Sequence, residues 1–307
     1  MTAESSTILP DSLVTTGWLA DNLEQPRLRI VDIRGYVHTT DLGDGRQRAE
    51  YVAAREEYEA GHLPGAVFID WTSDIVDPDH PVKAQIAPPG RFAAAMEARG
   101  IGSESDVVIV DHTGGNFATR LWWALRYYGH DRAAVLDGGH QKWVREGRPL
   151  VTSAPVTSQA TFIPRMRPQL RVDAADVLDL MGTGAGTIVD ARDAGQYSGQ
   201  IVRGSRGGRI PTAVHVPAKS LVNEDGTWKP VAEQRAILEA GGIGQDERVV
   251  AYCNGGVTAT AVLFALHRTG HAYFANYDGS WNEWGERADL PVESGPSPAT
   301  GWAWSGE

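Results

Sequence analysis

Cys253 is the only cysteine in the 307-residue sequence, and small residues follow it. Two glycines in this stretch let the chain curl so that successive backbone N–H groups point inward, and a helix expected from Thr258 adds the positive end of its dipole. Such a cradle stabilises a thiolate or another anion. We therefore expect a nucleophilic cysteine, Cys253, in an active-site loop formed by Asn254, Gly255, Gly256, Val257 and Thr258.

A lone cysteine also has a simpler interpretation, because free cysteines are usually small buried hydrophobes. Cys253, however, directly follows an apolar run typical of a buried strand and precedes a glycine-bearing turn and a helical pattern. In open parallel α/β sheets, ligands bind outside the carboxyl ends of the strands. The position therefore favours catalysis. A single cysteine also excludes an intramolecular disulfide, a cysteine-rich zinc site and a dithiol redox pair.

The elements that must position this loop occur twice along the chain. Five blocks recur in the same order: 29–34 as 187–192, 61–67 as 208–214, 99–102 as 241–244, 107–110 as 249–252 and 136–143 as 277–284. Self-similarity of this kind indicates two copies of one structural unit.

Each copy alternates short β-branched runs with amphipathic segments. In the second copy we expect strands at 187–189, 213–216, 249–252 and 273–277, and helices at 231–240 and 258–269. This alternation predicts α/β domains, each with a mostly parallel sheet flanked by helices. We expect domains at 1–152 and 153–292, joined through a stretch rich in Ser, Thr and Pro, and a flexible tail at 293–307.

The two copies differ at the end of the third strand. Asp111 stands in the first copy where Cys253 stands in the second. A residue present in both copies is more readily explained as scaffold, and one present in a single copy is a candidate for function. We therefore expect the first domain to be catalytically silent.

Charge and composition narrow the class of partner. The sequence has 28 Lys and Arg against 39 Asp and Glu, a net charge of −11, which disfavours binding to nucleic acid or to an anionic membrane. No apolar run is long enough for a signal peptide or a membrane helix, so we expect a cytosolic protein. The nine histidines lack metal-ligand spacing, and we expect neither a metal nor a cofactor.

The sequence resembles the tandem-domain sulfurtransferases of the rhodanese family. These proteins carry a Cys-x-x-Gly-Val-Thr-Ala loop in the second domain only, and residues 253–259 match it; 190–192, 209–214 and 277–284 are similar to other family signatures. The resemblance spans 13–292 and implies that Cys253 takes sulfur from a small anionic donor, thiosulfate or 3-mercaptopyruvate, as a persulfide. The sulfur then passes to cyanide, a small thiol or a thioredoxin-like acceptor, without a cofactor.

The resemblance also suggests substrate-binding residues. Arg192 matches the arginine that holds the anionic end of the donor, and Arg203 falls where a second one is often found. Arg34 occupies the place of Arg192 in the first copy, so Arg192 could instead be a structural brace. The basic stretch 202–209 is either a solvated loop or a local attractor for anionic donors.

Two uncharged residues follow the cysteine, whereas thiosulfate enzymes of the family tend to carry basic residues there. Asn254 and Gly255 therefore favour the 3-mercaptopyruvate type. That type usually has a serine where Gly255 stands, which puts a Ser, His and Asp proton relay in doubt. His80 lies in the region of the relay histidine, but a surface-loop histidine is the simpler interpretation.

Two other functions remain open at this point. A cysteine-dependent phosphatase would need an arginine six positions after the cysteine, where this sequence has Ala259. A noncatalytic binding or scaffold protein with two inert domains would not need to retain Cys253, since Asp111 shows what a silenced loop contains.

Overall fold

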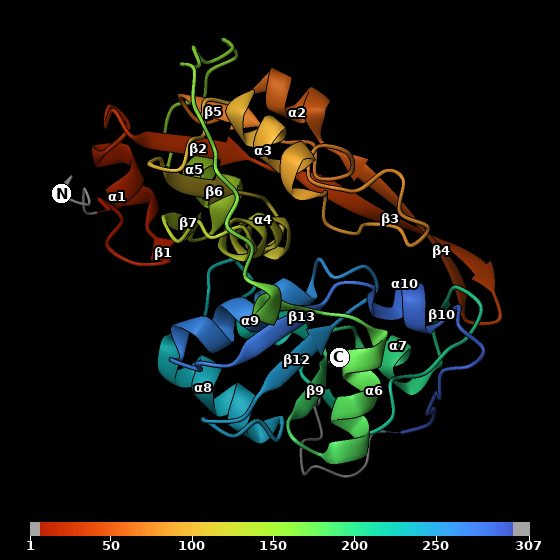
Figure 1. Cartoon of the computed structure of the whole chain (residues 1–307). Helices are drawn as coiled ribbons and strands as arrows, with labels where there is room; N and C mark the ends of the chain where they lie inside the picture. The colour runs from red at the N-terminus through yellow and green to blue at the C-terminus, as the bar shows by residue number, and fades with distance from the viewer. Residues whose placement is uncertain (1–6, 297–307) are drawn as a thin grey trace.

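Two five-stranded parallel sheets form the two halves of the chain in this computed structural model, which describes residues 7–296. The first sheet has the order β1-β7-β6-β2-β5 and the second the order β11-β9-β12-β13-β8. Their strands are β1 (Leu13–Val14), β2 (Leu28–Asp32), β5 (Ala66–Phe68), β6 (Asp106–Val110), β7 (Ala133–Leu136), β8 (Arg171–Val172), β9 (Thr187–Asp190), β11 (Val214–His215), β12 (Val249–Tyr252) and β13 (Phe274–Tyr277). Figure 1 shows the halves stacked on each other. The predicted α/β fold is confirmed.

Helices cover both faces of each sheet. Those of the first half are α1 (Thr16–Asp21), α2 (Arg55–Ala60), α3 (Pro89–Glu97), α4 (Asn116–Tyr127) and α5 (Gly139–Arg145). Those of the second half are η1 (Pro168–Leu170), α6 (Ala174–Thr183), α7 (Ala194–Ser198), η2 (Ala218–Leu221), α8 (Val231–Ala240), α9 (Ala259–Arg268) and α10 (Ser280–Trp284). Strands covered on both faces are apolar throughout rather than alternating, and every residue of β6 and β12 is buried.

The expected elements of the second copy match the structure closely. The strand at 249–252 and the helix at 231–240 have the predicted bounds. The expected strand at 213–216 is shorter, at 214–215, and the helix expected at 258–269 is one residue shorter at each end. Apolar periodicity therefore located the elements, and only their ends differ.

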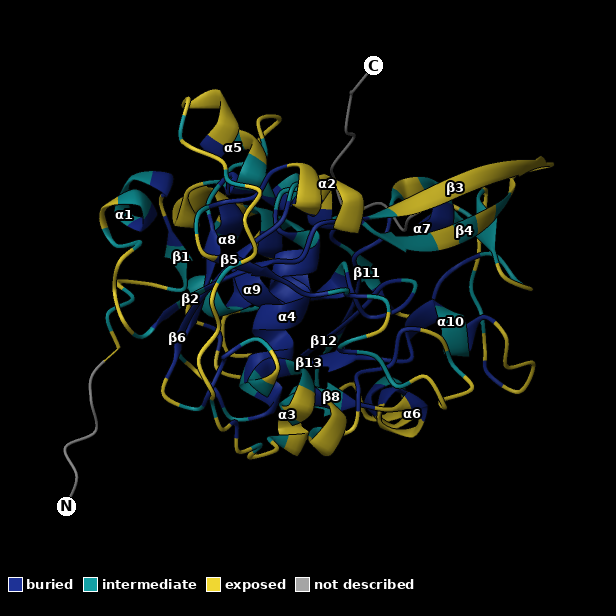
Figure 2. Cartoon of the chain, turned by 90° about the horizontal axis from the view of Figure 1, so that it is seen from above, coloured by how far each residue is buried: buried dark blue, intermediate teal, exposed yellow. Residues whose placement is uncertain are grey.

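Helices α4 and α9 join the two halves along an apolar interface. The hydroxyl oxygens of Thr119 and Thr260 lie 3.0 Å apart, and the rings of Trp122 and Phe264 meet edge to face at 4.9 Å between centroids. Nearly every residue of both helices is buried, as Figure 2 shows at the centre of the molecule. A helix that is buried all round needs protein on every side, so the two halves share one core.

A long hairpin reaches from the first half to the second (Figure 1). It consists of β3 (Gly35–Gly43) and β4 (Arg46–Ala53), and β4 pairs in parallel with β10 (Val202–Arg203). Asp44 and Gly45, at the tip, both have positive φ, as a type I′ turn requires. This hairpin was not predicted, although an Asp-Gly pair between strand-forming residues is the strongest sequence signal of a hairpin.

The chain between the halves has no helix or strand at 152–167, and the backbone N–H groups of Arg165 and Arg167 bond to the first half. The first residues of the predicted tail are paired: the backbones of Arg209 and Glu293 form a bridge, and Gly295 donates to Ser198. The rest of that tail, 297–307, lies outside the described residues. No helix among the described residues has the length and apolarity to span a membrane.

Candidate active site

The loop after β12 is held from one side by α10. Cys253 is 2% exposed, and its N–H donates to the Ser280 hydroxyl at 3.1 Å. The carbonyl oxygens of Cys253 and Asn254 accept from the N–H groups of Trp281 and Asn282 at 3.0 and 2.7 Å. A β-carbon at residue 256 would lie 2.8 Å from a backbone oxygen, and φ there is +70°, so only glycine fits.

The remaining backbone donors of this loop are free. Among the described residues, no protein group accepts a hydrogen bond from the N–H groups of 254–258. These groups lead into α9, where N–H groups lack intrahelical partners and the helix dipole is positive. The loop therefore has backbone N–H groups beside the thiol that no protein acceptor uses and that can donate to an anion.

The thiol opens on a cavity of about 330 Å³ that both halves build. The cavity is lined by Gly35, Tyr36, Val37, Tyr51, Trp71, Thr113, Asn116, Phe117, Arg203, Cys253, Asn254, Gly255, Val257 and Thr258. A larger cavity, of about 440 Å³, lies beside the segment 158–163 but has no cysteine in its lining. The structure thus brings Cys253, Arg203 and every predicted loop residue except Gly256 to one cavity.

The equivalent loop of the first half is closed by its own side chain. The buried Asp111 carboxylate accepts from the backbone N–H groups of Thr113, Gly115, Phe117 and Ala118, at 3.2, 3.0, 2.9 and 3.1 Å. No lysine or arginine of the described chain forms an ion pair with this carboxylate. The hydroxyl of Thr113 donates to it as well, at 3.2 Å. Backbone amides and one hydroxyl therefore hold this buried carboxylate without a cationic partner.

Arg203 is the one charged residue in the cavity lining. Its Nε donates to Gln47 of the hairpin at 3.0 Å, and its two terminal amino groups make no hydrogen bond to the described residues. Burial lowers the pKa of Arg203 from its ordinary value, although the guanidinium stays cationic at neutral pH. Arg203 can therefore hold the anionic end of a small ligand.

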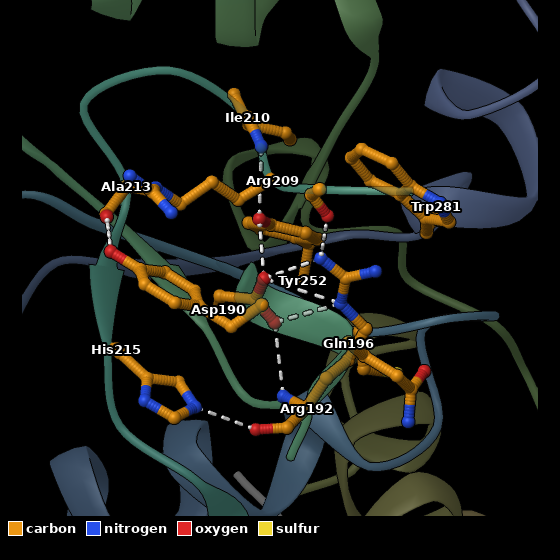
Figure 3. A network of polar contacts seen from close by, with 12 residues as sticks. Asp190, Arg192, Gln196, Arg209, Ile210, Ala213, His215, Tyr252 and Trp281 are labelled. Carbon is orange, nitrogen blue, oxygen red and sulfur yellow. Dashed lines mark hydrogen bonds and ion pairs between the residues drawn. The ribbon is translucent and has the colours of Figure 1, made fainter. Parts of the chain in front are cut away.

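Arg192 does not reach the cavity. Its guanidinium donates to both carboxylate oxygens of Asp190, with contacts of 2.6–3.2 Å, and to the carbonyl of Gly208 at 2.7 Å (Figure 3). It also stacks 4.4 Å from the ring of Trp281, and its side chain is 2% exposed. Because Nε and Nη2 are bound to these groups and Arg192 is not among the residues that line the cavity, the structure does not support the expected substrate contact.

The first half contains the same arrangement. Arg34 donates to Asp32 at 3.0 Å and to the carbonyl of Gly61 at 2.9 Å. Both arginines lie two residues after the aspartate that ends a central strand, β2 or β9. Each connects that strand to the segment that precedes the neighbouring strand of the same sheet, β5 or β11. The shared geometry identifies a brace that belongs to the fold.

The other two arginines of the basic stretch are bound to protein groups away from the cavity. Arg206 donates to the backbone carbonyls of Trp284, Gly285 and Leu290. Arg209 is buried, pairs with Glu293 and lies over a tyrosine ring. These two arginines hold the turn in place, and only Arg203 of this stretch faces the cavity.

His80 lies on an exposed loop, where its Nδ1 accepts from the backbone of Val82 at 3.1 Å, and it does not line the cavity. The residue of this region that approaches the cysteine loop is Ala84. The structure therefore places no histidine of the described chain in the cavity lining.

An ion pair between the halves clamps the cysteine loop, and sequence reasoning did not find it. Arg120 of α4 pairs with Asp278 at 2.6 Å and donates to the carbonyl of Gly256 at 3.1 Å and of Ala84 at 2.8 Å. Asp278 also accepts from the N–H of Ile86 at 2.9 Å. Residues of the first half thus hold the backbone of the cysteine loop at Gly256, and the same ion pair holds the neighbouring segment 84–86.

A model of the rhodanese-like domain matches residues 15–146 and 173–287. The chain belongs to the rhodanese family. This member is 34% identical to the 3-mercaptopyruvate sulfurtransferase of Escherichia coli K12, over 91% of this chain and 97% of the relative. It is 32% identical to the sulfur carrier protein TtuD of Thermus thermophilus, over 93% and 98%. The predicted tandem rhodanese sulfurtransferase is confirmed as the class of this enzyme.

Solved structures agree with this assignment. The crystal structure of SseA, a 3-mercaptopyruvate sulfotransferase of Escherichia coli, superposes with a TM-score of 0.78 at 31% identity and covers 88% of this chain and 98% of its own. An anaerobic ergothioneine biosynthesis enzyme of Chlorobium limicola has the same TM-score at 23% identity, which shows a shared fold alone.

Proposed function

We propose that this rhodanese moves sulfane sulfur from 3-mercaptopyruvate or thiosulfate to a thiophilic acceptor through a persulfide on Cys253. The observation that carries the proposal is the set of N–H groups of 254–258, which have no acceptor among the described residues and lie beside the only cysteine. The equivalent amides of the first half already hold the carboxylate of Asp111, which makes that domain silent. A persulfide anion on Cys253 would meet the same kind of donors.

The reaction follows as a double displacement. The Cys253 thiolate attacks the outer sulfur of the donor, an S–S bond forms, and the bond to the rest of the donor breaks with its electron pair. Sulfite leaves from thiosulfate, or pyruvate enolate from 3-mercaptopyruvate. The acceptor then attacks the outer sulfur of the persulfide and releases the thiolate. Covalent catalysis divides one transfer into two easier steps.

The charge of the cavity supports 3-mercaptopyruvate as the preferred donor. Arg203 supplies one cationic group, and the residues after the cysteine, Asn254 and Gly255, are neutral. A single guanidinium matches one carboxylate with paired hydrogen bonds, whereas thiosulfate brings two negative charges. In this proposal Arg203 binds the donor and Arg192 is a positioning residue that acts through Asp190.

An intact-mass measurement tests the function. The protein is incubated with 3-mercaptopyruvate or with thiosulfate, and we expect a mass gain of one sulfur atom that is lost on addition of cyanide. Cys253→Ser is the control and should gain nothing. The absence of an adduct with both donors would support a noncatalytic binding protein. Hydrolysis of a phosphate ester dependent on Cys253 would support a phosphatase. The acceptors named above and a cytosolic location stay predictions.

A further inference from the structure

Gly255 lines the cavity without a side chain, and the hydroxyl group of Tyr51 lies close beside it. A β-carbon placed on Gly255 would lie 3.4 Å from Tyr51 Oη and 3.2 Å from the Ala84 methyl group. Gly255 is two residues from Cys253, and Tyr51 lines the same cavity. The loop therefore has no side chain at the place where a hydroxyl reaches in from the first half.

Tyr51 is held so that its proton stays available. It lies in β4, and its ring packs against Trp71 with the centroids 5.2 Å apart. Its oxygen accepts from Asn282 Nδ2 at 3.4 Å, and its own O–H has no acceptor among the described residues. Burial raises the pKa of Tyr51 above its ordinary value, so the phenol keeps its proton at neutral pH.

We propose that Tyr51 is a catalytic residue that relays a proton from an α-keto thiol donor to the carbon fragment that leaves. This inference rests on the proposed sulfur transfer from 3-mercaptopyruvate. It adds the group that protonates the enolate oxygen of the departing keto acid. A hydroxyl in hydrogen-bond reach of the departing atom is the geometric requirement for general acid catalysis. No histidine of the described chain lines the cavity to take that role.

The step balances without an added reagent. As the S–S bond to Cys253 forms, the C–S bond breaks and its electron pair enters the enolate of the departing keto acid. Tyr51 gives its phenol proton to the enolate oxygen, and the phenolate then takes the proton carried on the transferred sulfur. The products are a persulfide anion and a neutral enol group, which tautomerises to the ketone in water. The two sulfur atoms of the new S–S bond together lose the two electrons that the carbon fragment gains, so the step needs no outside oxidant or reductant.

Thiosulfate provides the comparison that isolates this role. Its S–S bond breaks to release sulfite as an anion, so the transfer needs no proton. A residue that only shapes the cavity should affect both donors, whereas a proton relay should affect one.

The test is Tyr51→Phe, which keeps the ring on Trp71 and removes the hydroxyl. We expect kcat for pyruvate formation from 3-mercaptopyruvate to fall about 100-fold, the effect of losing a general acid, with little change in KM. For thiosulfate, we expect the fold-loss of kcat for sulfite formation to be at least ten times smaller than the fold-loss with 3-mercaptopyruvate. Tyr273→Phe, an exposed tyrosine outside the cavity, is the matched control.

A rescue variant separates the chemistry from the packing. Gly255→Ser in the Tyr51→Phe background places a hydroxyl beside the same position. The φ of Gly255 is not left-handed, and the Asn282 amide, 2.9 Å from the new β-carbon, is a side-chain group that can shift to admit it. We expect it to recover about tenfold of the lost kcat with 3-mercaptopyruvate.

The outcomes are distinguishable. Equal losses with both donors, or no loss with 3-mercaptopyruvate, would overturn the relay and leave the persulfide function intact. A wild-type protein that accepts sulfur from thiosulfate but not from 3-mercaptopyruvate would also overturn the relay. A wild-type protein that forms no persulfide with either donor would overturn the function and the relay together.

Discussion

The loops after β6 and β12 share one backbone plan and carry different residues at their base, Asp111 and Cys253. The backbone N–H of His140 donates to the carbonyl of Asp111 at 2.8 Å, and the backbone N–H of Trp281 donates to the carbonyl of Cys253 at 3.0 Å. In the first half a carboxylate occupies the amides, and in the second half the amides are free beside a thiol. The difference teaches that the cradle belongs to the fold, and that the residue at its base decides whether it is filled or reactive.

The features that do not differ are equally informative. The Asp32–Arg34 and Asp190–Arg192 braces are alike in sequence, burial and partners. A residue that makes the same contacts in the half with the cysteine and in the half without it does not explain a reaction at that cysteine. The hairpin β3–β4 has no counterpart among the described strands of the second half, and it supplies Tyr51 to the cavity.

The largest expected effect comes from giving the loop after β12 the aspartate that the loop after β6 contains. Cys253→Asp should lose sulfur transfer by more than about 1,000-fold, because no thiolate is left to attack the donor. The protein should remain folded, since the new carboxylate can accept from the free amides as Asp111 does. Donor turnover and thermal unfolding measure the two effects. A folded variant that still transfers sulfur would break the comparison.

The braces should matter for stability in both halves. Arg192→Ala and Arg34→Ala each leave a buried aspartate without its partner, and we expect each to lower the free energy of unfolding by about 3–5 kcal/mol. Denaturant unfolding measures this effect. A stable Arg192→Ala variant with a raised KM for the donor would instead return Arg192 to substrate binding.

Arg203→Ala should raise KM for 3-mercaptopyruvate about 10- to 100-fold, because it removes a charged hydrogen-bond donor from the cavity. The free energy of unfolding should change by less than about 1 kcal/mol, since the guanidinium makes one hydrogen bond to Gln47. Steady-state kinetics at several salt concentrations measure KM. An unchanged KM would mean that the donor does not contact Arg203.

The smallest expected effect concerns the interface between the halves. Burial against Trp122, together with Arg126, lowers the pKa of His267 to about 4 from an ordinary value of 6.5. The unfolded chain therefore binds this proton first, and the folded state loses stability as the pH falls from 6.5 to 4. We expect the wild type to lose about 2 kcal/mol more than His267→Gln over this range in denaturant unfolding. Equal losses would contradict the assignment.

Patterns that are local along the chain were predictable. The apolar run before Cys253, the glycines after it and the helical period beyond them lie within about 20 residues, and the structure confirms the strand and the helix. Asp44 and Gly45 were a local signal of the same kind for the hairpin, although its partner strand β10 lies about 155 residues away.

The sequence by itself therefore determined the repeat, the α/β class, the strand before the single cysteine and the glycine loop after it, because each follows from residue type and short-range spacing. Only the tertiary structure decided which charged and polar groups share the cavity. Arg192 and Arg203 are both arginines in the sequence and cannot be told apart there. In the structure, Asp190 binds Arg192, whereas Gln47 in the hairpin of the first half binds Arg203 at the cavity. Long-range packing and competition among hydrogen-bond partners decide where a guanidinium or a phenol points. Neither effect produces a periodic pattern of residues that could be recognised in the sequence.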